Sequence, residues 1–344
     1  MSKLTIEEKS WAFYDWANSA YSMAITSTLL PIYFKMITDN SGISSATSTA
    51  YWGYANSFAT LLISLLAPIL GTIADYKDYK KRFFIFFVTI GVSFTALLSI
   101  EGAGNYKVLL LFYILTVIGF SGANIFYDSF IVDITSKERM DKISSLGYAL
   151  GYIGSTIPFI ICIAIVILSQ KHIIPLSIAS ACQISFIITA LWWGMFTLPM
   201  IKNVKQVNYI EREPKPVTNS FKRMLSTLKN IKHHKSVMLF LIAYFFYIDG
   251  VDTIIKMATV YGSDLGVSST SLLIILLATQ FVACPFALLY GKLAGKFKGK
   301  FMLNVAIIMY VIICIYAYFL KTTLDFWSLA MLVGTSQCGS QALS

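Results

Sequence analysis

Acidic and amide side chains recur inside segments that are otherwise apolar. Asp15 and Asn18 stand three residues apart in "FYDWANSAY", at the start of an apolar run, and Asn124 and Asp128 stand four apart in another run. Residues three or four apart lie on one face of a helix, so each pair forms a polar patch. A carboxylate there can bind a proton or an ammonium group. In a membrane it costs about 2.5–3.5 kcal/mol on insertion scales, which points to a functional role.

The second part of the chain carries matching groups. Asp249, Asp252 and Lys256 form one stripe at helical spacing, and Gln337 and Gln341 stand four apart near the end of the chain. Lys256 is a candidate for binding a carboxylate. The spacing of Asp252 and Lys256 equally fits an intrahelical ion pair that neutralises both groups. For the amides, hydrogen bonding between helices is the competing interpretation.

The composition is that of a polytopic membrane protein. Hydrophobic residues make up 57% of the 344-residue chain, charged residues 13%, and the mean hydropathy is +0.70. Soluble domains average about 25% charged residues, so this chain has too few to cover a soluble surface. The net charge of +10 comes from basic residues in short loops between apolar runs, which argues against nucleic-acid binding. The five cysteines lie inside apolar runs, without disulfide or zinc spacing, so neither a metal nor a cofactor is expected.

Ten segments are long and apolar enough to be membrane-spanning helices. Their length and lack of alternation favour helices over barrel strands. We therefore predict an all-α membrane protein. The predicted spans are 11–35, 49–74, 83–101, 106–130, 143–168, 174–198, 237–261, 268–290, 301–320 and 324–344.

The loops alternate in charge. Most of the 27 lysines and arginines fall at one end of the predicted spans, with the N-terminus and the loop 199–236. The positive-inside rule makes that end cytoplasmic. We predict a first bundle over 1–198, a basic linker over 199–236 and a second bundle over 237–344. Within the linker, apolar residues from Phe221 to Ile231 recur at helical spacing, which favours an amphipathic helix on the inner leaflet over a solvated linker.

The two bundles resemble each other. The loop "GTIADYKDYKKR" (71–82) is matched by "GKLAGKFKGK" (291–300), each read as a glycine that ends a helix, a short turn and a basic cluster. "YDWANS" (14–19) is matched by "YIDGVDT" (247–253). Related halves with a site at their interface are typical of transporters. The polar faces occur in every third span, the first, fourth, seventh and tenth, which predicts a shared water-filled cavity between these helices.

The loop between the second and third spans resembles a signature of the major facilitator superfamily. The matching residues, which the resemblance implies form a gating loop, are Gly71, Asp75, Lys80, Lys81 and Arg82. The resemblance implies a bundle of six plus six helices whose first, fourth, seventh and tenth members line the cavity. In the second copy Gly295 stands where an aspartate would match Asp75, which implies a weaker gate there.

A narrower resemblance covers nearly the whole chain. The segments "FYDWANSAY", "NIFYDSFIVDI", "SSLGYALGYIG", "FYIDGVDTI" and "GSQALS" resemble the vacuole-effluxer-like family, which includes the fungal vacuolar amino-acid exporter. The resemblance implies efflux of amino acids or similar small solutes. The family pattern continues for two more helices, so a second half of four helices out of six, a truncated chain, is expected. The glycines Gly147, Gly151 and Gly154 favour close helix packing over a drug-antiporter signature.

These observations predict a monomeric secondary active transporter that moves a small solute, most plausibly amino acids, by alternating access, with proton-coupled efflux. Asp15, Asp128 and Asp249 are the candidate proton or ammonium sites, and nearby aromatic residues such as Tyr14, Tyr21 and Tyr127 are candidates for lining the path. The alternatives are an exporter of a sugar, organic anion or drug, and a receptor or scaffold without turnover. No enzyme motif is found. A bacterial inner membrane is favoured over a vacuolar membrane.

Overall fold

The structure, a computed structural model, describes residues 4–100, 105–211, 216–231, 234–297 and 299–342. The described chain is almost entirely helical, and its one β-bridge joins Tyr76 to Ile210. The elements are α1 (Ile6–Tyr21), the π-helix η1 (Ser22–Leu29), α2 (Leu30–Asn40), α3 (Ser45–Ala74), α4 (Tyr79–Leu97), α5 (Tyr106–Ser129), α6 (Ile131–Ile134), the 3-10 helix η2 (Lys137–Arg139), α7 (Met140–Gln170), α8 (Ile178–Asn203), α9 (Pro216–Ile231), α10 (Lys235–Asp264), α11 (Ser269–Phe297), α12 (Gly299–Tyr318) and α13 (Thr323–Ala342).

Each of the ten predicted spans corresponds to a helix, so the predicted all-helical membrane fold is confirmed. The first span is a continuous helical segment made of α1, η1 and α2. Seven helices are by themselves long and apolar enough to cross a membrane. Three predicted spans remain. The first is divided by η1, α4 carries Lys80, Lys81 and Arg82 in its first turn, and α13 is polar.

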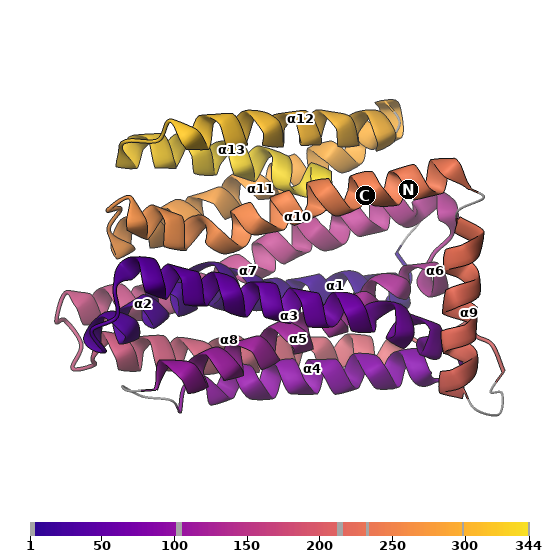
Figure 1. The fold of residues 1–344 in the computed structure, drawn as a ribbon, viewed down its shortest axis with the longest axis horizontal. Coiled ribbons are helices and arrows are strands. Elements are labelled where there is room, and N and C mark those ends of the chain that lie inside the picture. The colour runs from indigo at the N-terminus through magenta and orange to yellow at the C-terminus, as the bar shows by residue number, and fades with distance from the viewer. Residues whose placement is uncertain (1–3, 101–104, 212–215, 232–233, 298, 343–344) are drawn as a thin grey trace.

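The long helices lie side by side, so the bundle has two ends (Figure 1). We call one the basic end; it holds the start of α1, the loop 75–78 and α9. The other, the opposite end, holds the loops 41–44, 171–177 and 265–268. In Figure 1 α9 runs across the basic end, roughly perpendicular to the other helices. The linker therefore does contain the predicted helix, and its side chains Phe221 and Leu225 are exposed.

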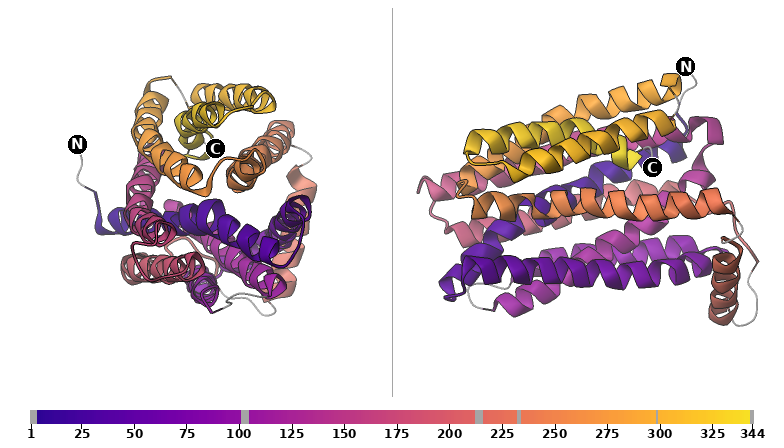
Figure 2. Two further views of the ribbon diagram at one scale, coloured as in Figure 1. Left: turned by 90° about the vertical axis from the view of Figure 1, so that its left-hand side faces the viewer. Right: turned by 45° about the horizontal axis from the view of Figure 1, so that its top comes forward.

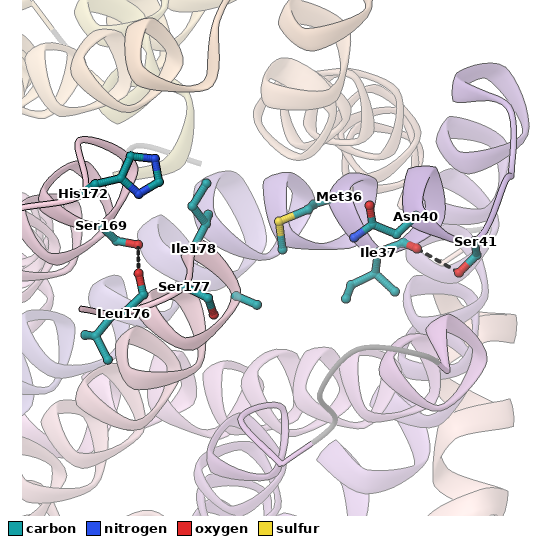
Figure 3. Close-up of a pocket in the computed structure, with 10 residues that line it drawn as sticks. Met36, Ile37, Asn40, Ser41, Ser169, His172, Leu176, Ser177 and Ile178 are labelled. Carbon is teal, nitrogen blue, oxygen red and sulfur yellow. Dashed lines mark hydrogen bonds between the residues drawn. The ribbon is translucent and has the colours of Figure 1, made fainter. Parts of the chain in front are cut away.

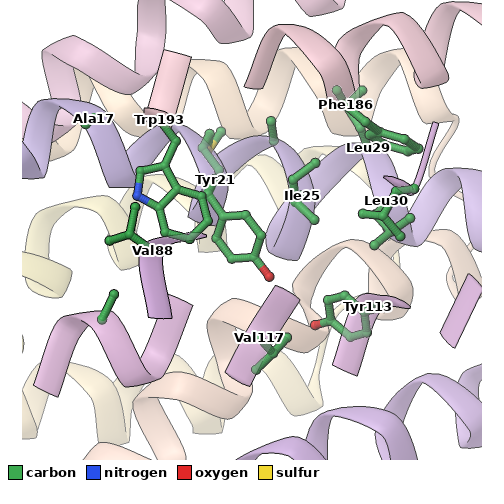
Figure 4. Close-up of a cluster of buried hydrophobic side chains, with 14 of the residues drawn as sticks. Ala17, Tyr21, Ile25, Leu29, Leu30, Val88, Tyr113, Val117, Phe186 and Trp193 are labelled. Atoms are coloured by element: carbon green, nitrogen blue, oxygen red, sulfur yellow. The ribbon is translucent and has the colours of Figure 1, made fainter. Parts of the chain in front are cut away.

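The helices form two halves, α1–α8 and α10–α13, which lie against each other along the bundle (Figure 2). The first half has a continuous core in which aromatic residues of α1, α4, α5 and α8 interlock. Tyr21 packs against Trp193 with ring centroids 5.1 Å apart (Figure 4). Its hydroxyl lies 2.7 Å from the hydroxyl of Thr116. The second half has smaller separate clusters, the largest around Leu272, Tyr310 and Phe326.

One expectation about local structure is wrong. The glycines of the repeated loops do not end their helices, because α3 continues through Gly71 to Ala74 and α11 continues through Gly291 to Phe297. A glycine away from the helix end lacks the positive φ that makes it a helix terminator. In the first loop that conformation is adopted by Asp78, with φ of 66°.

Candidate functional site

Asp15 is held against α7 by three glycines. A methyl group added at Gly147 would lie 2.6 Å from Oδ2 of Asp15, and one at Gly151 would lie 2.5 Å from Oγ of Ser19. A methyl group at Gly154 would lie 2.6 Å from the Trp16 ring. The stripe of glycines therefore lets the backbone of α7 approach α1 closely enough to bury Asp15, which is 8% exposed.

The polar faces of α1 and α5 meet as predicted. The amide of Asn18 donates a hydrogen bond of 2.7 Å to Oδ1 of Asn124. Trp11 stacks on Tyr127 with ring centroids 4.4 Å apart, and its indole N–H donates to the Tyr127 carbonyl over 2.8 Å. These contacts bring the Tyr127 hydroxyl beside the Asp15 carboxylate.

Asp128 lies at the same place but in a different environment. Its side chain is exposed, although it is close enough to Asp15 for the two carboxylates to interact electrostatically. One carboxylate is therefore enclosed by the first half and the other is accessible. Tyr14, Tyr21 and Tyr127, in contrast, are at most 3% exposed, so the expectation that they line a path is wrong. They pack the core, because each has a ring partner in a neighbouring helix.

The second half adds a polar face on α10. Tyr244 lies near enough to Asp128 of the first half and to Asp252 of its own helix to be affected by the charge of both. Nζ of Lys256 lies 3.4 Å from Oδ2 of Asp252, with 23% of the lysine side chain exposed. Asp252 and Lys256 thus form the intrahelical ion pair that their spacing allows. Asp249 of the same helix is exposed.

Of the two predicted amides of α13, the structure describes the side chain of one. Gln337 is half-buried, whereas Gln341 belongs to the helix but its side chain lies outside the described part of the structure. A further amide, Gln280 of α11, is 9% exposed and donates to Sδ of Met23 in η1 over 3.1 Å. Gln280 is the single amide in the described part of α11, and its isolation hid this role.

The predicted gating loop is tied to the rest of the basic end by Lys80. Nζ of Lys80 lies 2.7 Å from Oδ2 of Asp133 and donates to the Ser129 carbonyl over 3.2 Å. The other oxygen of Asp133 accepts from the backbone N–H groups of Val207, at 3.2 Å, and Asn208, at 2.7 Å. The carboxylate of Asp133 is thereby fully enclosed.

The other loop residues are nearer the surface. Gly71 has no atom within 4 Å of the position of an added methyl group, and Asp75 ends α3 and accepts from the backbone N–H of Ile210 over 2.8 Å. Lys81 donates to the Val204 carbonyl over 3.0 Å. Arg82 lies 6.0 Å from the centre of the Tyr79 ring. The linker segment 204–210 is thus attached to the loop by several bonds.

A second buried ion pair at the basic end was not predicted. Oε2 of Glu8 lies 2.8 Å from Arg139, and Oε1 accepts from the Thr135 hydroxyl over 2.7 Å. Glu8 also forms a capping box with Thr5 at the start of α1. The pattern "TIEE" gave a signal for the capping box, because a threonine followed by a glutamate three residues later starts many helices. Nothing in the sequence pointed to Arg139.

Two cavities lie at the opposite end, away from these residues. The larger, of about 660 Å³, is enclosed by α2 and the loop between α7 and α8, with Asn40, Ser169 and His172 in its wall (Figure 3). The smaller, of about 340 Å³, lies between the halves and includes Lys35 and Thr259. Among the described residues no group of three or more His, Cys, Asp or Glu side chains could hold a metal ion.

The architecture is that of a major facilitator superfamily transporter. The proton:xylose symporter XylE bound to 6-bromo-6-deoxy-D-glucose matches with a TM-score of 0.64 at 11% identity, over 98% of this chain and 80% of that one. The nucleoside transporter NupG matches with a TM-score of 0.60 at 12% identity, also over 98% and 80%. At these identities the likeness establishes the fold alone.

The chain belongs to the family described as "Vacuole effluxer Atg22 like", whose model matches residues 44–344. An uncharacterized MFS-type transporter of Bacillus subtilis, YxiO, is 57% identical over all of this chain and 80% of its own length. Autophagy-related protein 22 of Kluyveromyces lactis is 21% identical over 80% of this chain and 64% of its own length. The expected family is confirmed, and the protein is a multi-pass membrane transporter.

Proposed function

We propose that this transporter moves amino acids across the membrane by alternating access, and that proton binding at Asp15 and Asp128 drives their efflux. The observation that carries the proposal is the position of Tyr244, which interacts with Asp128 of the first half and with Asp252 of the second. This position supports treating the polar groups of the two halves as one site. Rocking of the halves would expose such a site alternately at each end.

The chemistry of this site suits a zwitterion. Asp128 is an accessible carboxylate that can accept an ammonium group, and Lys256 can bind a carboxylate if the solute competes with Asp252. The 3.4 Å separation of that pair and its partial exposure make competition feasible, since exposed pairs contribute little stability. Asp15 is more enclosed and is better suited to a proton, because burial disfavours the charged form of a carboxylate.

The same site allows other small polar solutes. Structural neighbours with this fold are titled as xylose and nucleoside transporters. A receptor or scaffold that binds without turnover is the alternative outside transport. For the cellular location we propose the bacterial plasma membrane, with the basic end in the cytoplasm. The gathering of basic residues at that end and the Bacillus subtilis relative support this orientation.

Counterflow in proteoliposomes tests the substrate class. Vesicles containing the full chain are loaded with an unlabelled mixture of amino acids and diluted into labelled amino acids. We expect transient accumulation of label, because exchange needs no imposed gradient. Vesicles loaded with xylose or with nucleosides serve as matched controls. Counterflow of those solutes alone would replace the amino-acid assignment. Saturable amino-acid binding without counterflow would favour a receptor or scaffold.

A further inference from the structure

Polar side chains join the two halves at the opposite end of the bundle. Lys35 of α2 forms an ion pair with Asp264, the last residue of α10. The Ser45 hydroxyl donates to Oδ1 of Asp264 over 3.0 Å, and the Thr49 hydroxyl donates to Oδ2 over 3.1 Å. Lys35 also donates to Ser45 over 2.9 Å. One carboxylate of the second half is thus held by three side chains of the first half.

A second contact between the halves lies deeper in the bundle. The hydroxyl of Thr259, which is 1% exposed, donates to the carbonyl of Ser27 in η1. In a regular α-helix that carbonyl would accept from the residue four positions later, which is Pro31 and has no N–H. Pro31 cannot donate to this carbonyl, and Thr259 of the second half does.

The π-helix η1 connects these contacts to the polar site. It begins four residues after Asn18 and ends six residues before Lys35. Both α10, through Thr259, and α11, through Gln280, bond to it. Single π-helical turns inside α-helices occur frequently at functional sites. A change in how α10 packs on η1 can thus be transmitted both to the site and to the ion pair.

The two ends of α10 also differ in burial, and the more buried end is the one that carries Asp264. Its buried residues are Val251, Thr259, Val260 and Gly262, all in the half of the helix nearer the opposite end. Phe245 and Phe246, nearer the basic end, are 64% and 70% exposed. Beneath the ion pair, the cavity of about 340 Å³ has walls from both halves, including Lys35, Val260 and Ser263. Contacts between the halves thus gather at the opposite end, next to a space large enough for a small solute.

We propose that Lys35 and Asp264, with Ser45 and Thr49, form the gate that closes the solute path at the opposite end, and that η1 is the joint linking the gate to the site. The inference rests on the proposed alternating-access function. In the state described by the structure the gate is shut. Opening toward the opposite end separates Asp264 from its three partners and exposes the cavity beneath, so the ion pair must break and re-form in each cycle.

Labelling of a cysteine at Val260 tests the gate without measuring transport. Val260 lines the cavity and is 2% exposed, so a maleimide reaches Val260→Cys only when the gate opens. The full chain carries this change after its own five cysteines are replaced, and it is placed in nanodiscs, which leave both ends accessible. We expect Asp264→Asn and Lys35→Gln each to raise the labelling rate severalfold, because each variant removes one partner of an ion pair in which the lysine side chain is 10% and the aspartate side chain 35% exposed.

Two further variants decide how that result is interpreted. Asp39→Asn removes a carboxylate that lines the same cavity but pairs with no described basic residue, and it should leave the rate unchanged. The exchanged pair, Lys35→Asp with Asp264→Lys, should return the rate toward that of the unaltered gate. Rates equal to the Asp39 control, or a raised rate that the exchange does not restore, would overturn the gate. If labelling depends on the ion pair as expected but amino-acid counterflow is absent, the gate is retained and the amino-acid assignment is withdrawn.

Discussion

At the scale of single residues, the charges that support the fold differ from those proposed to act. Lys80 is paired with Asp133, and Glu8 with Arg139, at N–O distances of 2.7 and 2.8 Å. Among the described residues Asp15 forms no ion pair with a basic side chain, although it is buried. A buried charge left without a counter-ion is costly to the fold. Its presence beside Asp128 therefore supports a functional role for the pair.

The paired charges should be essential for stability. Asp133→Asn leaves Lys80 enclosed without its counter-ion and weakens the bonds to Val207 and Asn208. We expect the free energy of unfolding to fall by about 3 kcal/mol or more. Thermal unfolding in detergent measures the change. The matched control is Asp78→Asn in the same loop, where the side chain is exposed and asparagine tolerates the positive φ. Equal stability of the two variants would contradict a structural role for Asp133.

The residues of the site could be selected from the sequence because their types are rare in apolar helices. Spacing alone placed Asn18 and Asn124 on faces that meet, and the structure joins them over 2.7 Å. Spacing could not identify partners distant in the chain. The pairs of Lys80 with Asp133 and of Lys35 with Asp264 depend on how the helix ends come together, so they required the structure.

At the scale of the elements, the packing of α1 on α7 determines the position of Asp15. The contact depends on Gly147, Gly151 and Gly154, whose missing side chains make room for residues of α1. The sequence predicted this use of the glycines. It did not predict η1, because "SMAITSTL" contains no glycine or proline to mark an irregular helix. The nearest signal was Pro31, which follows the π-helix rather than lying in it.

A methyl group in the glycine stripe should separate α7 from α1. Gly154→Ala places its Cβ 2.6 Å from the Trp16 ring, and overpacking of this kind costs about 1–3 kcal/mol. We expect a lower melting temperature and reduced counterflow. Gly250→Ala in α10 is the control, because no atom lies within 4 Å of the added Cβ and a helical alanine is favoured over glycine. Normal stability and activity of Gly154→Ala would show that close approach is not needed.

At the scale of the whole molecule, the two halves contribute unequal parts of the proposed site. The first half supplies the enclosed polar pair of α1 and α5 within a continuous core, and the second half supplies Tyr244 and the ion pair of α10. The internal repeat predicted this division, as did the polar face in every third span. The sequence could not predict at which end the two halves meet, because contacts between helices determine this and the residue pattern within each helix does not.

Proton-driven accumulation in proteoliposomes tests the central claim most directly. Uptake of labelled amino acids is measured with and without an imposed proton gradient in the unaltered chain, in Asp15→Asn and in Asp141→Asn, which changes an exposed carboxylate at the start of α7. We predict gradient-dependent accumulation in the unaltered chain and in Asp141→Asn. Asp15→Asn should retain exchange but lose accumulation, since asparagine mimics a carboxyl group that stays protonated. Accumulation by Asp15→Asn equal to that of the unaltered chain would contradict proton coupling at this site.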